Sequence, residues 1–143
     1  MIKPRFASWL VVAAGLMGSM GGLQAATGGA IPVQVNIPDM NQKGWEYRVA
    51  LSSADSAPAG SHLTELSWRY ELTANGVLPE AWLCAPSECV ALKMAQGSTA
   101  AFKGMPISTP LSLHFVVPGK GMLKRPVQGG VAQIFVNYQR QDP

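Results

Sequence analysis

The feature that most constrains the fold is an alternation of apolar and polar side chains with a period of two. Successive side chains point to opposite faces of a strand, so this pattern is typical of antiparallel sheets with one buried and one solvated face. The clearest cases are residues 31–37, 45–51, 66–72 and 111–117. After residue 25 no segment has the 3.6-residue period of an amphipathic helix. The sequence therefore predicts an all-β protein.

Turn-forming residues divide the chain into about eight short strands, spaced roughly every 8 to 12 residues. We expect turns at 38–44, Asn75-Gly76 and Pro118-Gly119, and a mobile loop over residues 52–61, which are rich in Ser, Ala, Pro and Gly. A short strand that contains Ala100 and Phe102 is expected to end at Gly104, and a last strand at Val131–Tyr138 precedes a frayed tail. Mixed strand lengths and Pro-rich connections favour an antiparallel β-sandwich over a closed barrel.

The first 25 residues have the pattern of an export signal. Lys3 and Arg5 precede an apolar run from Phe6 to Met20, and Ala25 offers a small residue at the cleavage point. The apolar run is shorter than the ~20 residues that a membrane-spanning helix needs, and glycines interrupt it. We expect cleavage after Ala25, one domain over residues 26–143, and no membrane insertion of the processed protein.

Charge argues against a nucleic-acid partner. The whole chain has 11 Lys and Arg against 8 Asp and Glu, and loss of Lys3 and Arg5 leaves 9 against 8. The densest basic group is Lys120, Lys124 and Arg125, which we interpret as a solvated loop. Binding through counterion release needs a much denser basic surface, so nucleic acid is not an expected partner.

The two cysteines predict one structural disulfide. Cys84 and Cys89 enclose Ala-Pro-Ser-Glu, a turn between two short apolar segments, and an exported protein is oxidised. The resulting stapled hairpin closes a short loop, which contributes roughly 2 kcal/mol to stability. Neither histidine has a spacing to the cysteines that matches a zinc motif, so no metal is expected.

No residue pattern identifies a catalytic site. Three of the five glutamates fall on the polar side of alternating strands, where a solvated carboxylate is the default. His114 lies on the outward side of its strand, and no local motif supplies a serine or cysteine partner, so we interpret it as a surface histidine. Gly119-Lys120-Gly121 lacks the remaining residues of a phosphate loop. We therefore expect no enzymatic activity and no cofactor.

The C-terminal two thirds of the chain resembles the FlhE family of exported flagellar proteins. The resemblance rests on Trp68-Arg69-Tyr70 with Leu72, Leu83-Cys84, Cys89-Val90 with Leu92, Gly97, Thr99, Ala101-Phe102, Gly104, Pro110-Leu111, Val117-Pro118-Gly119 with Gly121, and Val136-Asn137-Tyr138. It covers about 75 residues in order. The segment from Ala26 to His62 matches only in character, and the tail after Tyr138 is longer than usual.

This resemblance implies a small, non-enzymatic periplasmic protein of the flagellar export system. Its role would be to limit proton leak through the export gate, or to act as a chaperone that keeps flagellar subunits from assembling in the periplasm. The implied partners are the export apparatus or its exported subunits. A partner can bind such a sandwich by adding a strand to an exposed edge.

We expect the free edges at the near-terminal strands 31–37 and 131–138, where Pro32 favours an edge position. The residues that we expect to contact a partner are Val33, Val35, Trp82, Val136 and Tyr138.

A second hypothesis is a peptidoglycan-binding or carbohydrate-binding β-sandwich module. Indole faces stack on sugars, and Trp45 and Trp82 are the candidate platforms, whereas Trp68 shares a face with core residues. Packing of Trp82 against the disulfide is the competing explanation for that residue. Both hypotheses fit a periplasmic protein.

Overall fold

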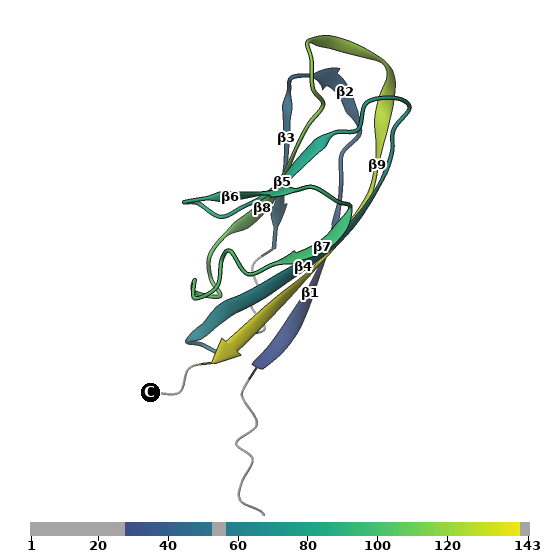
Figure 1. Cartoon of the computed structure of the whole chain (residues 1–143). Helices are drawn as coiled ribbons and strands as arrows, with labels where there is room; N and C mark the ends of the chain where they lie inside the picture. The colour runs from purple at the N-terminus through teal and green to yellow at the C-terminus, as the bar shows by residue number, and fades with distance from the viewer. Residues whose placement is uncertain (1–27, 53–56, 141–143) are drawn as a thin grey trace, which may run out of the picture.

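The computed structural model describes residues 28–52 and 57–140, which form two antiparallel sheets packed face to face (Figure 1). The expected export signal, part of the expected mobile loop (53–56) and the last residues of the tail (141–143) lie outside the described residues. The all-β prediction is confirmed, and none of the described residues belongs to a helix that could cross a membrane.

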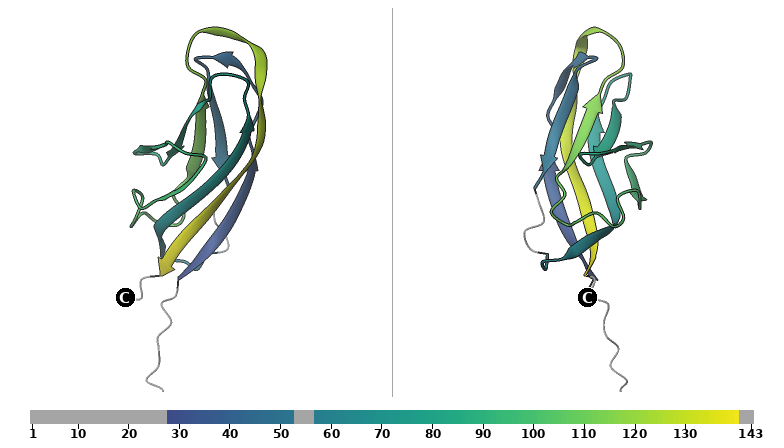
Figure 2. Two further views of the ribbon diagram at one scale, coloured as in Figure 1. Left: turned by 45° about the vertical axis from the view of Figure 1, so that its right-hand side comes forward. Right: turned by 90° about the vertical axis from the view of Figure 1, so that its left-hand side faces the viewer.

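The described residues form nine strands, close to the predicted number. They are β1 (Gly28–Asn36), β2 (Met40–Lys43), β3 (Glu46–Leu51), β4 (Ser61–Thr73), β5 (Glu80–Cys84), β6 (Cys89–Leu92), β7 (Gln96–Thr99), β8 (Leu111–Val116) and β9 (Gly121–Arg140). The five-stranded sheet has the order β1-β9-β4-β7, and β2 also pairs with β9. The four-stranded sheet has the order β3-β8-β5-β6. Figure 2 shows the long strands β1, β4 and β9 running side by side along the molecule.

The core fills the space between the sheets, and alternation along each strand supplies it. On β8, Leu111, Leu113 and Phe115 are buried while the residues between them face outward. Tyr70 on β4 meets Phe115 across the interface, edge to face, with ring centroids 5.6 Å apart. Trp68, expected in the core, is 8% exposed, and its Nε1 donates to the Met94 carbonyl oxygen at 2.9 Å.

Strand β9 is much longer than the predicted Val131–Tyr138 segment. Its first part pairs with β2, and its second part pairs with β1 on one side and β4 on the other. The change of partner falls at Gly129 and Gly130. A Cβ at Gly129 would lie 1.8 Å from the Ile37 carbonyl oxygen, and one at Gly130 would lie 2.5 Å from the Glu71 carbonyl oxygen. Only glycine allows these chains to approach so closely.

Three local predictions are wrong. Residues 40–43 form β2 rather than part of a turn, because β9 extends far enough back to pair with them. The strand expected near 100–102 is instead β7 at Gln96–Thr99, and residues 101–104 form a turn that buries Phe102. Gln139 and Arg140 continue β9 and pair with β4, so the frayed tail does not begin at Gln139.

Candidate functional site

The outer face of the four-stranded sheet carries a connected set of polar side chains. Ser112 and His114 are two residues apart on β8, so both point away from the core. On β3, Arg48 lies directly opposite His114, and on β5, Trp82 does so from the other side. Ser112 lies between Ala50 and Cys84 in the same way.

Hydrogen bonds join four side chains of this face, those of Ser112, His114, Glu46 and Arg48, which we call the outer-face array. The Ser112 hydroxyl lies 2.7 Å from Nε2 of His114, and Nδ1 of His114 bonds to Oε1 of Glu46. Because an ionised carboxylate only accepts, Nδ1 of His114 donates to Glu46, and in the neutral ring Nε2 accepts from the Ser112 hydroxyl. Oε2 of Glu46 accepts from the Arg48 guanidinium at 3.1 Å. The His114 side chain is 13% exposed, so this array holds its ring in one orientation.

The surroundings of Glu46 favour its ionised form. The hydrogen bond from Arg48, and then the one from His114, lower the pKa of the Glu46 carboxyl below its ordinary value. The Glu46 side chain is 42% exposed, so solvent screens both interactions. Glu46 therefore stays charged at neutral pH and fixes which nitrogen of His114 holds the proton.

The order Ser112, His114, Glu46 is that of a hydrolase relay, but the surroundings of Ser112 do not complete one. Acyl transfer also needs backbone donors aimed at the developing oxyanion. Ser112 is the second residue of β8, a strand with neighbours on both sides, and it pairs with Ala50 of β3 and Cys84 of β5. The partner that sequence reasoning missed for His114 was two residues away, in the Ser-x-His spacing of one strand.

Two open hollows flank His114. One, of about 430 Å³, is lined by Arg48, Ser112, His114 and the disulfide. The other, of about 290 Å³, is lined by Glu46, Trp82, His114 and the disulfide. The Cys84–Cys89 bridge is formed as predicted and closes the β5–β6 hairpin.

The two tryptophans proposed as sugar platforms do not line a common hollow beside His114. Trp82 is half-buried on the outer face and lines the smaller hollow, beside the disulfide. Trp45 is 58% exposed in the turn before β3 and lines neither hollow beside His114.

Among the strands of residues 28–52 and 57–140, β1 lies at an edge of the five-stranded sheet, as expected, and no other strand pairs with its outer side. The Ile37 N–H donates to the Gly130 carbonyl at 2.9 Å, and the register with β9 is unbroken from Gly28 to Asn36. The backbone N–H and C=O groups of successive residues point to opposite sides of a strand. Those of the odd-numbered residues of β1 therefore bond to β9, and those of the even-numbered residues point outward from the sheet edge. Pro32 thus removes one donor from the free edge, while Gln34 and Asn36 keep theirs.

The side chains that we expected to contact a partner from the two near-terminal strands are less accessible than the edge backbone of β1. Val33 is buried and Val35 is half-buried, and both pack against the core. The expectation of a second edge at 131–138 is wrong, because β9 pairs with β1 and β4 at once. Val136 is 4% exposed, and the ring of Tyr138 lies over Gly29. Their near-terminal position in the sequence does not make β9 peripheral in the sheet.

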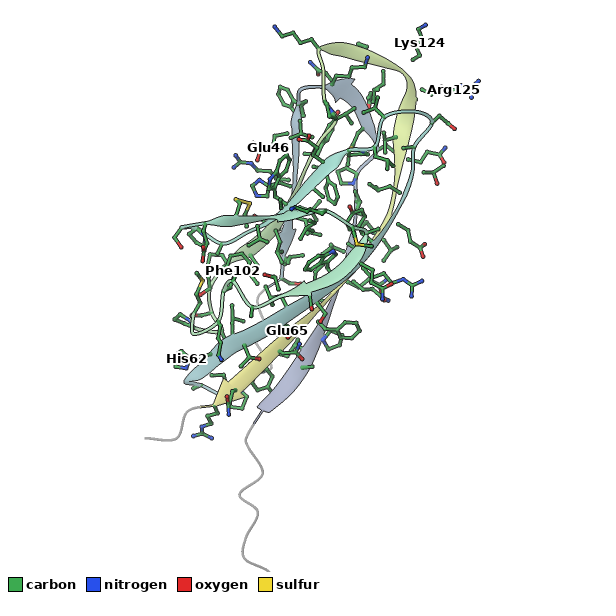
Figure 3. The ribbon with its side chains drawn as sticks, viewed as in Figure 1. Glu46, His62, Glu65, Phe102, Lys124 and Arg125 are labelled. Atoms are coloured by element: carbon green, nitrogen blue, oxygen red, sulfur yellow. A yellow bond between two sulfur atoms is a disulfide. The ribbon has the colours of Figure 1, made fainter. Side chains whose placement is uncertain are left out.

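Neither histidine is part of a metal site in the described segments, where no three His, Cys, Asp or Glu residues are grouped to hold an ion. His62 is half-buried at the start of β4, in the sheet that does not carry the outer-face array, and its Nδ1 is buried without a hydrogen-bond partner in the described residues. Figure 3 labels His62 at one end of the molecule and Glu46 on the other half.

Comparison with known proteins identifies the family. The model of flagellar protein FlhE matches residues 38–139. Flagellar protein FlhE from Salmonella typhimurium is 36% identical over 85 residues, which cover 57% of this chain and 64% of the relative. The protein of the same name from Yersinia enterocolitica is 29% identical over 86 residues, which cover 58% of this chain and 60% of the relative. Each of these sequence matches thus spans less than two thirds of the relative.

The fold agrees with this match. A solved structure titled "Crystal Structure of FLHE" superposes with a TM-score of 0.70 at 31% identity, covering 80% of this chain and 98% of that chain. The chain belongs to the flagellar protein FlhE family.

Proposed function

We propose that this protein is a periplasmic accessory of flagellar export that acts without catalysis, as a chaperone that keeps exported flagellar subunits from assembling before they reach the growing structure. The observation that carries the proposal is the free edge of β1 in a member of a flagellar family. Family membership supplies the flagellar context, and the edge supplies a means of binding an extended segment.

The periplasmic location is supported by two features. The Cys84–Cys89 disulfide is of the structural kind that is typical of oxidising compartments. Residues 1–25 have the charge and apolar pattern of an export signal, with cleavage after Ala25.

The β1 edge suits transient rather than permanent binding. Gln34 and Asn36 present backbone donors and acceptors outward, so a subunit segment can add a strand there. Pro32 interrupts the row of donors, which limits the length of the added strand and discourages edge-to-edge pairing between copies of the protein. A chaperone has to release its subunit, and a short pairing serves this purpose.

Crosslinking tests the partner. A photo-crosslinking residue replaces Asn36 on the β1 edge, and a matched one replaces exposed Lys103 in the turn after β7. Both proteins are expressed in flagellated cells, and the captured partners are identified by mass spectrometry. Capture of rod, hook or filament subunits from position 36, and not from 103, supports the chaperone role.

A backbone variant tests the binding mode. Gln34→Pro removes an outward N–H, so it leaves the ladder with β9 intact and should abolish subunit binding. Gln34→Thr keeps the N–H and is the control. Equal subunit binding by both variants, with both folded, would exclude strand addition at β1.

Two other outcomes point to other functions. Capture of export-gate membrane proteins in place of subunits favours a role in limiting proton leak through the gate. A shift of tryptophan emission on addition of muropeptides, absent in Trp82→Leu, favours the peptidoglycan-binding function, because Trp82 lines a hollow together with Glu46 and His114.

A further inference from the structure

Three connecting segments meet at one end of the sandwich, and we call this end the basic tip. They are residues 43–45, from the end of β2 to the start of β3, residues 75–78 between β4 and β5, and residues 117–125, which include the first residues of β9. The Gly44 N–H donates to the Val117 carbonyl at 2.7 Å, and Lys43 lies opposite Gly121 in the ladder of β2 and β9. A hollow of about 500 Å³ is lined by Val77 together with Lys43, Met122 and Lys124, among others.

The basic tip lies far from both ends of the described chain. In Figure 3, Lys124 and Arg125 project from the end of the molecule opposite His62, and in Figure 1 the start of β1 and the end of β9 lie near that other end. Docking through the tip would therefore leave both ends of the domain pointing away from the docked surface.

The charge of the tip is positive throughout. It contains Lys43, Lys120, Lys124 and Arg125, and its three segments contain no Asp or Glu. None of the ion pairs within the described residues uses one of these four cations. The adjacent Glu46 is already bonded to Arg48 and His114. Residues 26–143 contain nine Lys and Arg and have a net charge of +1, and four of these nine cations are gathered at the tip.

Exposed apolar side chains gather at the same end. Trp45 is 58% exposed, Val77 56%, Leu78 70% and Met122 69%. They are four of the six large apolar side chains exposed in the described residues, the others being Met94 and Phe135. Scattered apolar side chains are normal on a surface, whereas a cluster marks an interaction site.

The backbone of the tip is built to present these side chains. A Cβ at Gly44 would lie 2.7 Å from the Gly119 carbonyl oxygen, so the two turns touch and brace each other. Both residues have positive φ values, 73° and 112°, which favour glycine. Trp45 follows the first of these glycines directly and Lys120 the second, so an indole and an ammonium project from neighbouring, braced turns.

We propose that the basic tip docks the protein onto the surface of a bilayer that contains anionic phospholipids. Lys and Arg bind the headgroups, and Trp, Leu and Met side chains reach the boundary with the acyl chains, which is the chemistry of interfacial binding. An exposed indole fits this boundary, because its apolar ring and polar N–H suit the two sides. This proposal is independent of the chaperone role.

Sedimentation with vesicles tests the proposal. The chain from Ala26 to Pro143 is mixed with vesicles of phosphatidylcholine, alone or with phosphatidylglycerol, and bound protein is measured at low and high salt. We expect binding to the anionic vesicles only, weakening as salt rises from about 0.1 M to about 0.5 M. Emission from Trp45 should shift to the blue on binding, since Trp68 is buried and Trp82 half-buried in the free protein.

Matched variants separate the tip from general charge and hydrophobicity. Each cation near an anionic surface contributes about fivefold to partitioning, so Lys124→Gln with Arg125→Gln should weaken binding about 25-fold. The double variant Lys93→Gln with Lys103→Gln removes the same charge from exposed sites elsewhere. It should change vesicle binding less than about twofold. Met122→Ser should weaken binding about fivefold, whereas Met94→Ser, at 71% exposure, should not.

Two results would overturn the proposal. One is a failure of the unmodified protein to bind anionic vesicles at low salt. The other is equal weakening by the tip variants and their matched controls, which would assign the binding to net charge rather than to this surface. Binding by the protein with loss confined to the tip variants supports it, whatever the crosslinking of β1 shows.

Discussion

Removal of the disulfide should weaken the fold without abolishing it. Cys84 and Cys89 face each other at the end of the β5–β6 hairpin, and the Ala85 N–H closes the turn on the Glu88 carbonyl at 2.8 Å. Three further pairs of the ladder hold the hairpin together without the bridge. β5 also pairs with β8, so the hairpin remains attached to the sheet.

The expected loss follows from the short loop and from the burial of one sulfur. Closing a loop of about six residues restricts the unfolded chain by roughly 2 kcal/mol on the chain-entropy model, which moves the midpoint of thermal unfolding by roughly 8 °C for a domain of this size. Cys84 is 5% exposed while Cys89 is exposed. Serine at position 84 buries a hydroxyl and loses a further 1–3 kcal/mol or so, whereas alanine does not.

Urea unfolding followed by circular dichroism measures these differences. The oxidised protein is compared with the reduced protein, with Cys84→Ala/Cys89→Ala and with Cys84→Ser/Cys89→Ser. We expect the reduced and alanine forms to lie about 2 kcal/mol below the oxidised form and the serine form lower still. A reduced protein that is unfolded at 25 °C would show that the bridge supports the whole fold. Equal stability of the serine and alanine forms would contradict the burial argument.

Three further predictions follow from packing and charge. Phe115→Ala should lower the free energy of unfolding by about 3–5 kcal/mol, since the ring is fully buried and meets Tyr70; a urea midpoint shift equivalent to less than about 1.5 kcal/mol would contradict this. Gly97→Ala should displace the indole of Trp68, whose Cζ2 would lie 2.6 Å from the new Cβ, and break its hydrogen bond to the Met94 carbonyl. We expect the free energy of unfolding to fall by about 1–3 kcal/mol and the tryptophan emission to shift to the red. An unchanged emission spectrum would contradict this prediction. Folding lowers the pKa of Glu46 from its ordinary value of 4.5, so the ionised carboxyl stabilises the fold above that pH, and this effect disappears as the pH falls through the folded-state pKa. The difference in stability between the unmodified protein and Glu46→Gln should therefore shrink from neutral to acidic pH. A difference that grows on acidification would refute the assignment.

The strands that could be predicted from sequence are those with one wet face. Residues 46–51 and 111–116 alternate cleanly, and each became a strand with the expected inward residues. The β5–β6 hairpin followed from the spacing of two cysteines around a turn. In each case the signal was local, because the pleat of a strand and the geometry of a short turn depend on residues near in sequence.

Strand β9 shows where local reasoning stops. Its first half contains Pro126 and three glycines, which are typical of a loop. Only the pairing with β2 and the passage beside Ile37 make this half a strand. The same tertiary pairing made β9 a central strand, although its place near the C-terminus suggested an edge. Sheet order depends on contacts between distant segments, and alternation along one strand contains no information about which strands flank it.

The outer-face array was missed for a related reason. Ser112 and His114 were adjacent in the alternation, but the third member, Glu46, comes from β3, 68 residues away, and is aligned with them only by the β3–β8 register. The basic tip was missed likewise. Lys120, Lys124 and Arg125 were visible as a basic stretch, and their apolar neighbours Trp45 and Leu78 come from other connections.

By itself, the sequence determined the all-β class, the disulfide hairpin, and which side chains face inward on most strands, because these depend on residue chemistry and short-range geometry. It also carried the scattered motifs that mark the FlhE family. The tertiary structure alone decided the order of strands in each sheet, and therefore that β1 is a free edge and β9 is not. It also decided which connections meet at the basic tip, because that grouping exists only once two sheets pack and distant turns are brought to one end.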